Sequence, residues 1–110
     1  MKEDRVYLLH ILECAERIRE YTQAGRASFL QDRKTQDAVL RNFEVIGEAA
    51  KRVSSLTRDR SGGIPWTRIA GFRDVLIHRY EGVDLEQVWQ RVERDLPSLE
   101  EEVRQLVSES

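Results

Sequence analysis

Apolar side chains that recur every three or four residues are the feature that most restricts the fold of this chain. The first segment, from Asp4 to about Tyr21, keeps this period with Val6, Leu9, Ile11, Leu12, Ala15 and Ile18. A period near 3.6 gathers such residues on one face of an α-helix. The sequence therefore predicts a first long helix, ended by Gly25. Ser28 is expected to cap a short helical turn through Phe29 and Leu30.

The same period predicts a second long helix from about Thr35 to Leu56. Its apolar face consists of Ala38, Val39, Phe43, Ile46, Ala50 and Val53, and most charged residues lie on the other face. Gly47 stands inside this segment, where glycine costs about 1 kcal/mol relative to alanine. We therefore expect Gly47 to permit a close crossing with another helix.

Two further helices follow the one clear loop, TRDRSGGIP, residues 57–65, in which Ser-Gly-Gly is flexible. Proline suits the first turn of a helix, so the third helix is predicted to begin near Pro65 and to end before Gly82. It could loosen at Gly71. Asp84 is a predicted N-cap of the last helix, and Pro97 should kink or restart that helix.

Four main helices with short connections favour an all-α, antiparallel four-helix bundle with a short extra helical turn. The chain has 110 residues, enough for one modest core, so we expect a single domain over residues 1–110. The formal net charge is −2, so any contact with nucleic acid must come from a local patch.

The numbers of cysteine and histidine residues restrict the kinds of disulfide and metal site that this chain can form. Cys14 is the only cysteine and has apolar neighbours, which indicates a small buried side chain and excludes an intrachain disulfide. With two histidines and one cysteine, no His/Cys cluster exists, and we expect neither a metal nor a cofactor. No segment reads as a signal peptide or a membrane span, so a reducing cytoplasm is the expected location, with no membrane contact.

Arg73 is the residue that fits the helical pattern least. On a helical projection it lies in the middle of an apolar stripe with Ile69, Leu76 and Tyr80. A guanidinium cannot lose its charge, so it needs a carboxylate, a polar cleft or an anion there. The simplest interpretation is a salt bridge inside the bundle, to Glu44 or Glu48.

Asp74, His78 and Tyr80 accompany Arg73 within eight residues. Asp74 and His78 stand four apart, so the carboxylate could orient one imidazole nitrogen. Taken singly, His78 suits the end of a helix, where the dipole favours positive charge, and Tyr80 suits the edge of a core. Taken together, the four residues could hold a phosphate and move a proton.

The segment RDVLIHRY, residues 73–80, resembles the Arg-X4-His-X-Tyr motif of HEPN-domain proteins, specifically the HepT-like toxins. The resemblance extends to QDAVLRNFEVIGEAAKRV, IPWTRIAGFRDVLIHRY and GVDLEQVW, and so covers nearly the whole chain in the same order. One departure is Asp74, where many HEPN motifs carry asparagine; this substitution is expected to alter how His78 is polarised.

This resemblance implies a metal-independent ribonuclease that works as a homodimer, with two motifs facing each other across a cleft. Arg73 and His78 would be catalytic, and Asp74 would support them. Arg73 would stabilise the charge on the RNA phosphate, and His78 would transfer a proton for attack by the ribose 2′-hydroxyl. The family also implies an antitoxin partner, an MNT-type nucleotidyltransferase that attaches AMP to Tyr80. The added charge and bulk would block the cleft.

Two other functions remain open at this point. The chain could be a non-enzymatic helical partner of a nucleotidyltransferase that binds nucleotide or nucleic acid, which its acidity and small size favour. It could also be a structural four-helix domain in which Arg73 is paired internally. RNA cleavage lost on Arg73→Ala or His78→Ala would select the ribonuclease.

Overall fold

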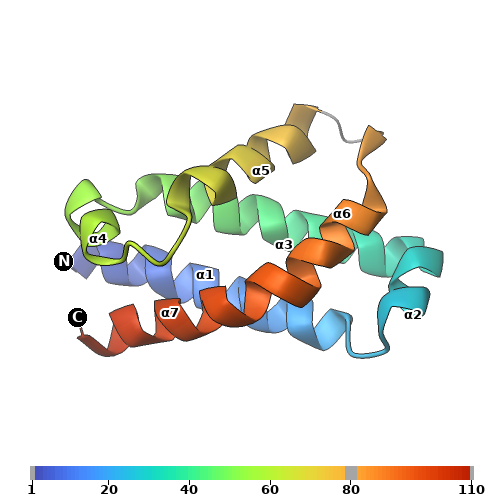
Figure 1. Ribbon diagram of the computed structural model, residues 1–110, viewed down its shortest axis with the longest axis horizontal. Coiled ribbons are helices and arrows are strands. Elements are labelled where there is room, and N and C mark those ends of the chain that lie inside the picture. Colours follow the sequence, from blue (N-terminus) through green and yellow to red (C-terminus); the bar gives the residue numbers. More distant parts are fainter. Residues whose placement is uncertain (1, 79–81, 110) are drawn as a thin grey trace.

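The computed structural model describes residues 2–78 and 82–109, and in these residues every regular element is helical. The long helices form rods, each antiparallel to the one before it along the chain (Figure 1). They are α1 (Lys2–Tyr21), α3 (Arg33–Arg52), α5 (Trp66–His78), and a composite of α6 (Leu85–Gln90), a π-helical turn (Arg91–Asp95) and α7 (Leu96–Glu109). The predicted all-α antiparallel bundle is confirmed.

The core follows the apolar period of each rod. α3 packs against both α1 and α5, and α7 packs against α1. The largest side chains that are fully buried come from all four rods and from the first connection: Phe29, Leu8, Ile11, Ile18, Ile46, Leu76, Val39, Val88 and Val103. Their burial supplies the main driving force for assembling the bundle.

The connections contain two short helices, α2 (Arg26–Gln31) and α4 (Ser55–Arg60). The predicted cap at Ser28 is wrong, because Ser28 lies inside α2 and the N-cap is Gly25, at a φ of 95°. Glycine adopts this left-handed φ without steric cost. The turn between α1 and α2 therefore depends on Gly25.

The predicted end of the second helix at Leu56 is also wrong. α3 ends at Arg52, Val53 turns to extended backbone, and α4 starts a new helix behind the N-cap Ser54. Asp4 of α1 stabilises this break. Its carboxylate accepts hydrogen bonds from the Ser54 backbone N–H (2.9 Å), the Ser54 hydroxyl (2.5 Å) and the Thr57 hydroxyl (2.5 Å).

Burial of Asp4 would raise its pKa, but these hydrogen bonds outweigh burial, so the pKa lies below its usual value. Only 3% of the residue is exposed. A buried carboxylate with this many donors fixes α1 to the start of α4, two segments that are 50 residues apart in the sequence.

The last rod begins at the predicted N-cap and contains Pro97 without a break in the helix. Asp84 accepts a hydrogen bond from the Glu86 backbone N–H, as an N-cap should. Pro97 lies in the first turn of α7, directly after the π-helical turn. Proline cannot donate to the carbonyl four residues earlier and collides with it, and a wider turn relieves both problems. The helix restarts rather than breaks.

The predicted burial of Cys14 in α1 is confirmed. The residue is only 4% exposed, and burial raises the pKa of its thiol. Within residues 2–78 and 82–109, no helix combines the length and apolar character needed to cross a bilayer.

Candidate functional site

Arg73 lies where α5 crosses α3, and Gly47 makes that crossing possible. A Cβ atom added at Gly47 would lie 2.3 Å from the Cβ and 3.1 Å from the Cγ of Arg73. Such separations are far below carbon–carbon contact, so only glycine allows α5 to come this close. The prediction that Gly47 permits a close helix crossing is confirmed. The Arg73 side chain thus emerges directly from the helix contact.

The charge of Arg73 is met mainly by Glu48 of α3. One terminal nitrogen of Arg73 lies 2.9 Å from Glu48 Oε2, and the other lies 3.4 Å from Asp74 Oδ1. Glu48 also pairs with Arg52 at 3.2 Å. Of the two predicted partners, Glu44 and Glu48, the ion pair is made with Glu48. The predicted position inside the bundle is wrong, because 49% of the Glu48 side chain and 22% of the Arg73 side chain are exposed.

A groove opens beside this ion pair. It has a volume of about 360 Å³ and is lined by Arg41, Glu44, Val45, Glu48 and Arg73. Arg41 pairs with Glu44 at 3.6 Å, so both arginines of the groove have a carboxylate neighbour. The Nε atom of Arg73 is buried without a hydrogen-bond partner among the described residues. An anion that entered the groove would meet two guanidiniums and would have to displace a carboxylate.

Asp74 points toward α3. Its Oδ1 accepts a hydrogen bond from Lys51 Nζ at 2.7 Å in addition to its contact with Arg73. The hydrogen bond from Lys51 is the main reason why the pKa of Asp74 lies below its usual value; the positive charges of Lys51 and Arg73 add to it. Asp74 is therefore held as a carboxylate between two cations, an arrangement that the sequence did not predict.

The remaining predicted site residues are His78 and Tyr80. His78 is the last residue of α5, five positions after Arg73, and its side chain lies outside the described part of the structure. Tyr80 falls outside the described residues altogether. The contact of Asp74 with His78 and the role of Tyr80 therefore stay predictions.

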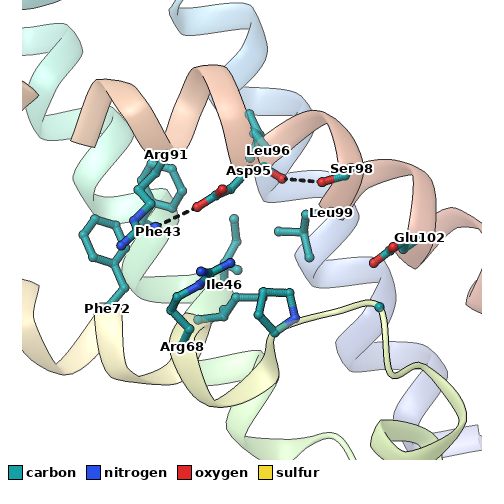
Figure 2. A pocket seen from close by; sticks show the side chains of 13 residues that line it. Phe43, Ile46, Arg68, Phe72, Arg91, Asp95, Leu96, Ser98, Leu99 and Glu102 are labelled. Carbon is teal, nitrogen blue, oxygen red and sulfur yellow. Dashed lines mark hydrogen bonds and ion pairs between the residues drawn. The ribbon is translucent and has the colours of Figure 1, made fainter. Parts of the chain in front are cut away.

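A second hollow, which sequence reasoning missed, lies on the other side of the crossing between α3 and α5 (Figure 2). It has a volume of about 140 Å³ and is lined by residues of α3, α5, the π-helical turn and α7. Phe43 and Phe72 meet edge to face at one end, with ring centroids 5.4 Å apart. Its lining residues come from distant parts of the chain, so no local motif could have indicated it.

The described residues contain no group of three or more His, Cys, Asp or Glu side chains placed to hold a metal ion. The described part of the candidate site is the Arg73 groove with its carboxylates.

Known proteins with similar sequences identify the family of this chain. The sequence pattern of the family "Ribonuclease HepT-like" matches residues 11–106. The chain is 45% identical to the "Probable ribonuclease HepT" of Thermococcus cleftensis, over 84% of this chain and 86% of that one. It is 37% identical to the "Putative RNase TTE0752" of Caldanaerobacter subterraneus, over 97% of this chain and 96% of that one.

A further relative is longer. The "Gamma-glutamylcyclotransferase and putative RNase MJ0434" of Methanocaldococcus jannaschii is 42% identical over 98% of this chain, which spans only 49% of that relative. No solved structure matches the chain significantly. The family pattern covers most of the chain, including α3, the Arg73 groove and α5, and on this basis the chain belongs to the HepT-like ribonuclease family.

Proposed function

We propose that this protein is a metal-independent endoribonuclease, the toxin of a HEPN/MNT toxin–antitoxin pair in the cytoplasm. Its membership of the HepT-like ribonuclease family carries this proposal, together with relatives that are named as ribonucleases. The groove beside Arg73 supports it, because a permanent cation stands there at a solvent-accessible edge of the bundle.

The proposed active form is a homodimer in which the two grooves face each other. Each protomer places Arg73 at the crossing of α3 and α5, with His78 at the end of the same helix. Five residues of α-helix rise by about 7.5 Å along the axis, and in the proposed dimer both motif residues act on one phosphodiester. The groove of a single protomer offers Arg73 and Arg41, each paired with a carboxylate, and a second copy would double the positive charge around the phosphate.

The catalytic roles follow from the chemistry of the side chains. Arg73 would exchange Glu48 for a phosphate oxygen and stabilise the negative charge that grows in the transition state. His78 would take the proton of the ribose 2′-hydroxyl or return one to the leaving oxygen. Asp74, held by Lys51, would keep the guanidinium oriented. The product would be a cyclic phosphate.

Control of the toxin would act on Tyr80. An MNT-type nucleotidyltransferase would transfer AMP from ATP to the Tyr80 hydroxyl and release pyrophosphate. The phosphodiester adds negative charge two residues from His78, where the RNA backbone must bind. Incubation with the cognate enzyme and ATP should add the mass of AMP to the parent protein. A Tyr80→Phe variant that gains the same mass would contradict the assignment.

The decisive experiment measures cleavage of a labelled RNA in the presence of a chelator. The parent should cut, and Arg73→Ala and His78→Ala should lose at least a hundredfold in rate, the usual effect of removing an electrostatic or proton-transfer group. Arg94→Ala is the matched control, because Arg94 is exposed and lines neither hollow. Both active-site variants must stay folded and dimeric. Cleavage at the parental rate by both would refute the roles.

One observation favours the alternative of a structural four-helix domain, because Glu48 already neutralises Arg73 within the same protomer, as a purely structural arginine would require. The other alternative, a non-enzymatic partner of a nucleotidyltransferase, predicts that nucleotide or the partner enzyme binds the parent protein while RNA is never turned over. A monomer in solution with no cleavage would favour a structural role.

A further inference from the structure

The hollow between α5 and α7 has the form of a ligand pocket (Figure 2). Its walls are mainly apolar and include Phe43, Ile46, Ile69, Phe72, Leu96 and Leu99. Four of its charged side chains stand around this apolar interior: Arg68, Arg91, Asp95 and Glu102. A concave apolar interior with a few polar groups around it is the usual make-up of a small-molecule site.

Two of these charges are already used by the protein. Arg91 and Asp95, the first and last residues of the π-helical turn, pair at 2.9 Å. The Arg91 guanidinium also lies over the Phe72 ring, 5.6 Å from its centroid. This pair forms a fixed wall of the pocket. Wide π-helical turns occur frequently at functional sites.

The other two charges have no partner in the described residues. No hydrogen bond or ion pair joins Arg68 or Glu102 to any residue in the described part of the chain. Figure 2 shows Arg68 reaching toward the hollow from α5, with Glu102 on the side of α7. Because Arg91 and Asp95 neutralise each other, the pocket offers one available cation and one available carboxylate at separate points of its rim.

The volume restricts the size of an apolar group inside. A cavity of about 150 Å³ holds one benzene molecule. The pocket, at about 140 Å³, therefore accepts one six-membered ring and leaves attached groups at the rim. A fitting ligand has a single flat ring, an anionic group for Arg68, and a hydrogen-bond donor for Glu102.

A pyrimidine nucleotide has all three features. We propose that this pocket binds one pyrimidine base of the RNA strand, with a neighbouring phosphate at Arg68, and that Glu102 favours cytosine over uracil. The cytosine amino group donates to a carboxylate, whereas the corresponding position of uracil is a carbonyl oxygen that would face the Glu102 charge. The choice of RNA as the ligand rests on the proposed ribonuclease function.

The position of the pocket defines which nucleotide it reads. Phe72 lines the pocket and the next residue, Arg73, lines the catalytic groove, so the two sites flank the same helix. The scissile phosphate would bind on one side of α5, and the base would insert on the other. The subsite therefore selects a nucleotide displaced along the strand from the cleaved bond.

The first experiment compares CMP, cytidine and UMP by calorimetric titration of the intact protein. CMP should bind about tenfold more tightly than cytidine, because a charge-assisted contact to Arg68 is lost in the nucleoside. In Arg68→Ala this ratio should fall to about one, while cytidine itself binds as before. Arg94→Ala is the matched control and should keep the parental ratio. An unchanged ratio in Arg68→Ala would overturn the proposal.

Glu102→Gln and Ser98→Trp test the remaining contacts. CMP should bind the parent about fivefold more tightly than UMP, the effect of one net hydrogen bond, and Glu102→Gln should remove this preference. Ser98 is exposed at the edge of the pocket, so Ser98→Trp closes the entrance without altering the core and should abolish binding of all three ligands. Retained binding in Ser98→Trp would place the nucleotide elsewhere.

A last experiment distinguishes failure of the nucleotide subsite from failure of the proposed ribonuclease function. A short RNA that contains cytosine should displace CMP from Arg73→Ala, a variant that keeps the pocket intact. If RNA competes but the parent never cleaves, the subsite stands and the ribonuclease assignment fails. If the parent cleaves RNA but neither CMP nor RNA binds the pocket at millimolar concentration, the subsite fails and the ribonuclease assignment stands.

Discussion

Replacing Gly47 with alanine tests whether the contact between α3 and α5 sets the position of Arg73. The new Cβ would stand 2.3 Å from the Cβ of Arg73, whereas carbon atoms in contact lie about 3.5–4.0 Å apart. The clash involves the root of the side chain, so a rotamer change cannot relieve it. The two helices must separate or slide by about 1 Å.

The expected change in stability combines two opposing terms. Overpacking of this kind costs about 1–3 kcal/mol. Alanine in a helix interior regains about 1 kcal/mol relative to glycine. The free energy of unfolding should therefore fall by about 0–2 kcal/mol. Gly71→Ala is the matched control, since Gly71 lies inside α5 with nothing within 4 Å of an added Cβ. The free energy of unfolding of Gly71→Ala should rise only by the gain in helix propensity, about 1 kcal/mol.

The assay is urea unfolding of both variants, followed by cleavage of a labelled RNA. The two free energies should differ by the steric term alone, about 1–3 kcal/mol. A displacement of about 1 Å at a catalytic group can cost about a hundredfold in rate, so Gly47→Ala should be slow and Gly71→Ala unaffected. Equal stability and equal rates in the two variants would refute the argument that glycine fixes this crossing.

Three further outcomes are expected. Asp4→Asn should lower the free energy of unfolding at neutral pH by about 1–3 kcal/mol. Folding lowers the pKa of Asp4, so the ionised carboxylate stabilises the folded protein at any pH above the pKa that Asp4 has in the unfolded chain. This stabilisation is lost as the pH falls through the pKa of Asp4 in the folded protein. The free energies of unfolding of parent and variant, measured in urea at several pH values, should therefore become equal in acid. Glu48→Gln removes a negative charge beside Arg73 and should lower the KM for RNA at low salt; a lower kcat instead would show that Glu48 holds the guanidinium in place. Lys51→Met should raise the pKa of Asp74 in an NMR titration, and no change would mean that Lys51 does not set it.

Much of the bundle could be predicted because its causes are local in sequence. The helical period identified the long rods, the N-cap at Asp84 depended on a residue two positions away, and the need for a close crossing was visible in Gly47 alone. The pairing of Arg73 with Glu48 followed from a charge on an apolar face. In each case one residue carried a strong physical constraint.

The errors arose where distant residues decide the outcome. The apolar period continues past Arg52, yet α3 ends there, and the start of the next helix is held by Asp4, 50 residues earlier than Ser54. The pocket between α5 and α7 likewise needs Arg68 and Glu102, which no motif connects. The contact of Asp74 with His78 stays a prediction, and the contacts of Asp74 with Lys51 and Arg73 were not foreseen because they depend on α3.

The π-helical turn explains the spacing of the buried residues in the last rod. Val88, Val92 and Leu96 are all buried although they stand four residues apart, and in a regular α-helix two such steps would rotate the apolar face by about 80°. The wide turn absorbs this excess. Removing one residue there, such as the exposed Glu93, would restore ordinary helical bonding and leave the core-facing side chains of α7 inward. Evolution could thus remodel the nearby hollow by a single-codon insertion or deletion while the scaffold keeps its register.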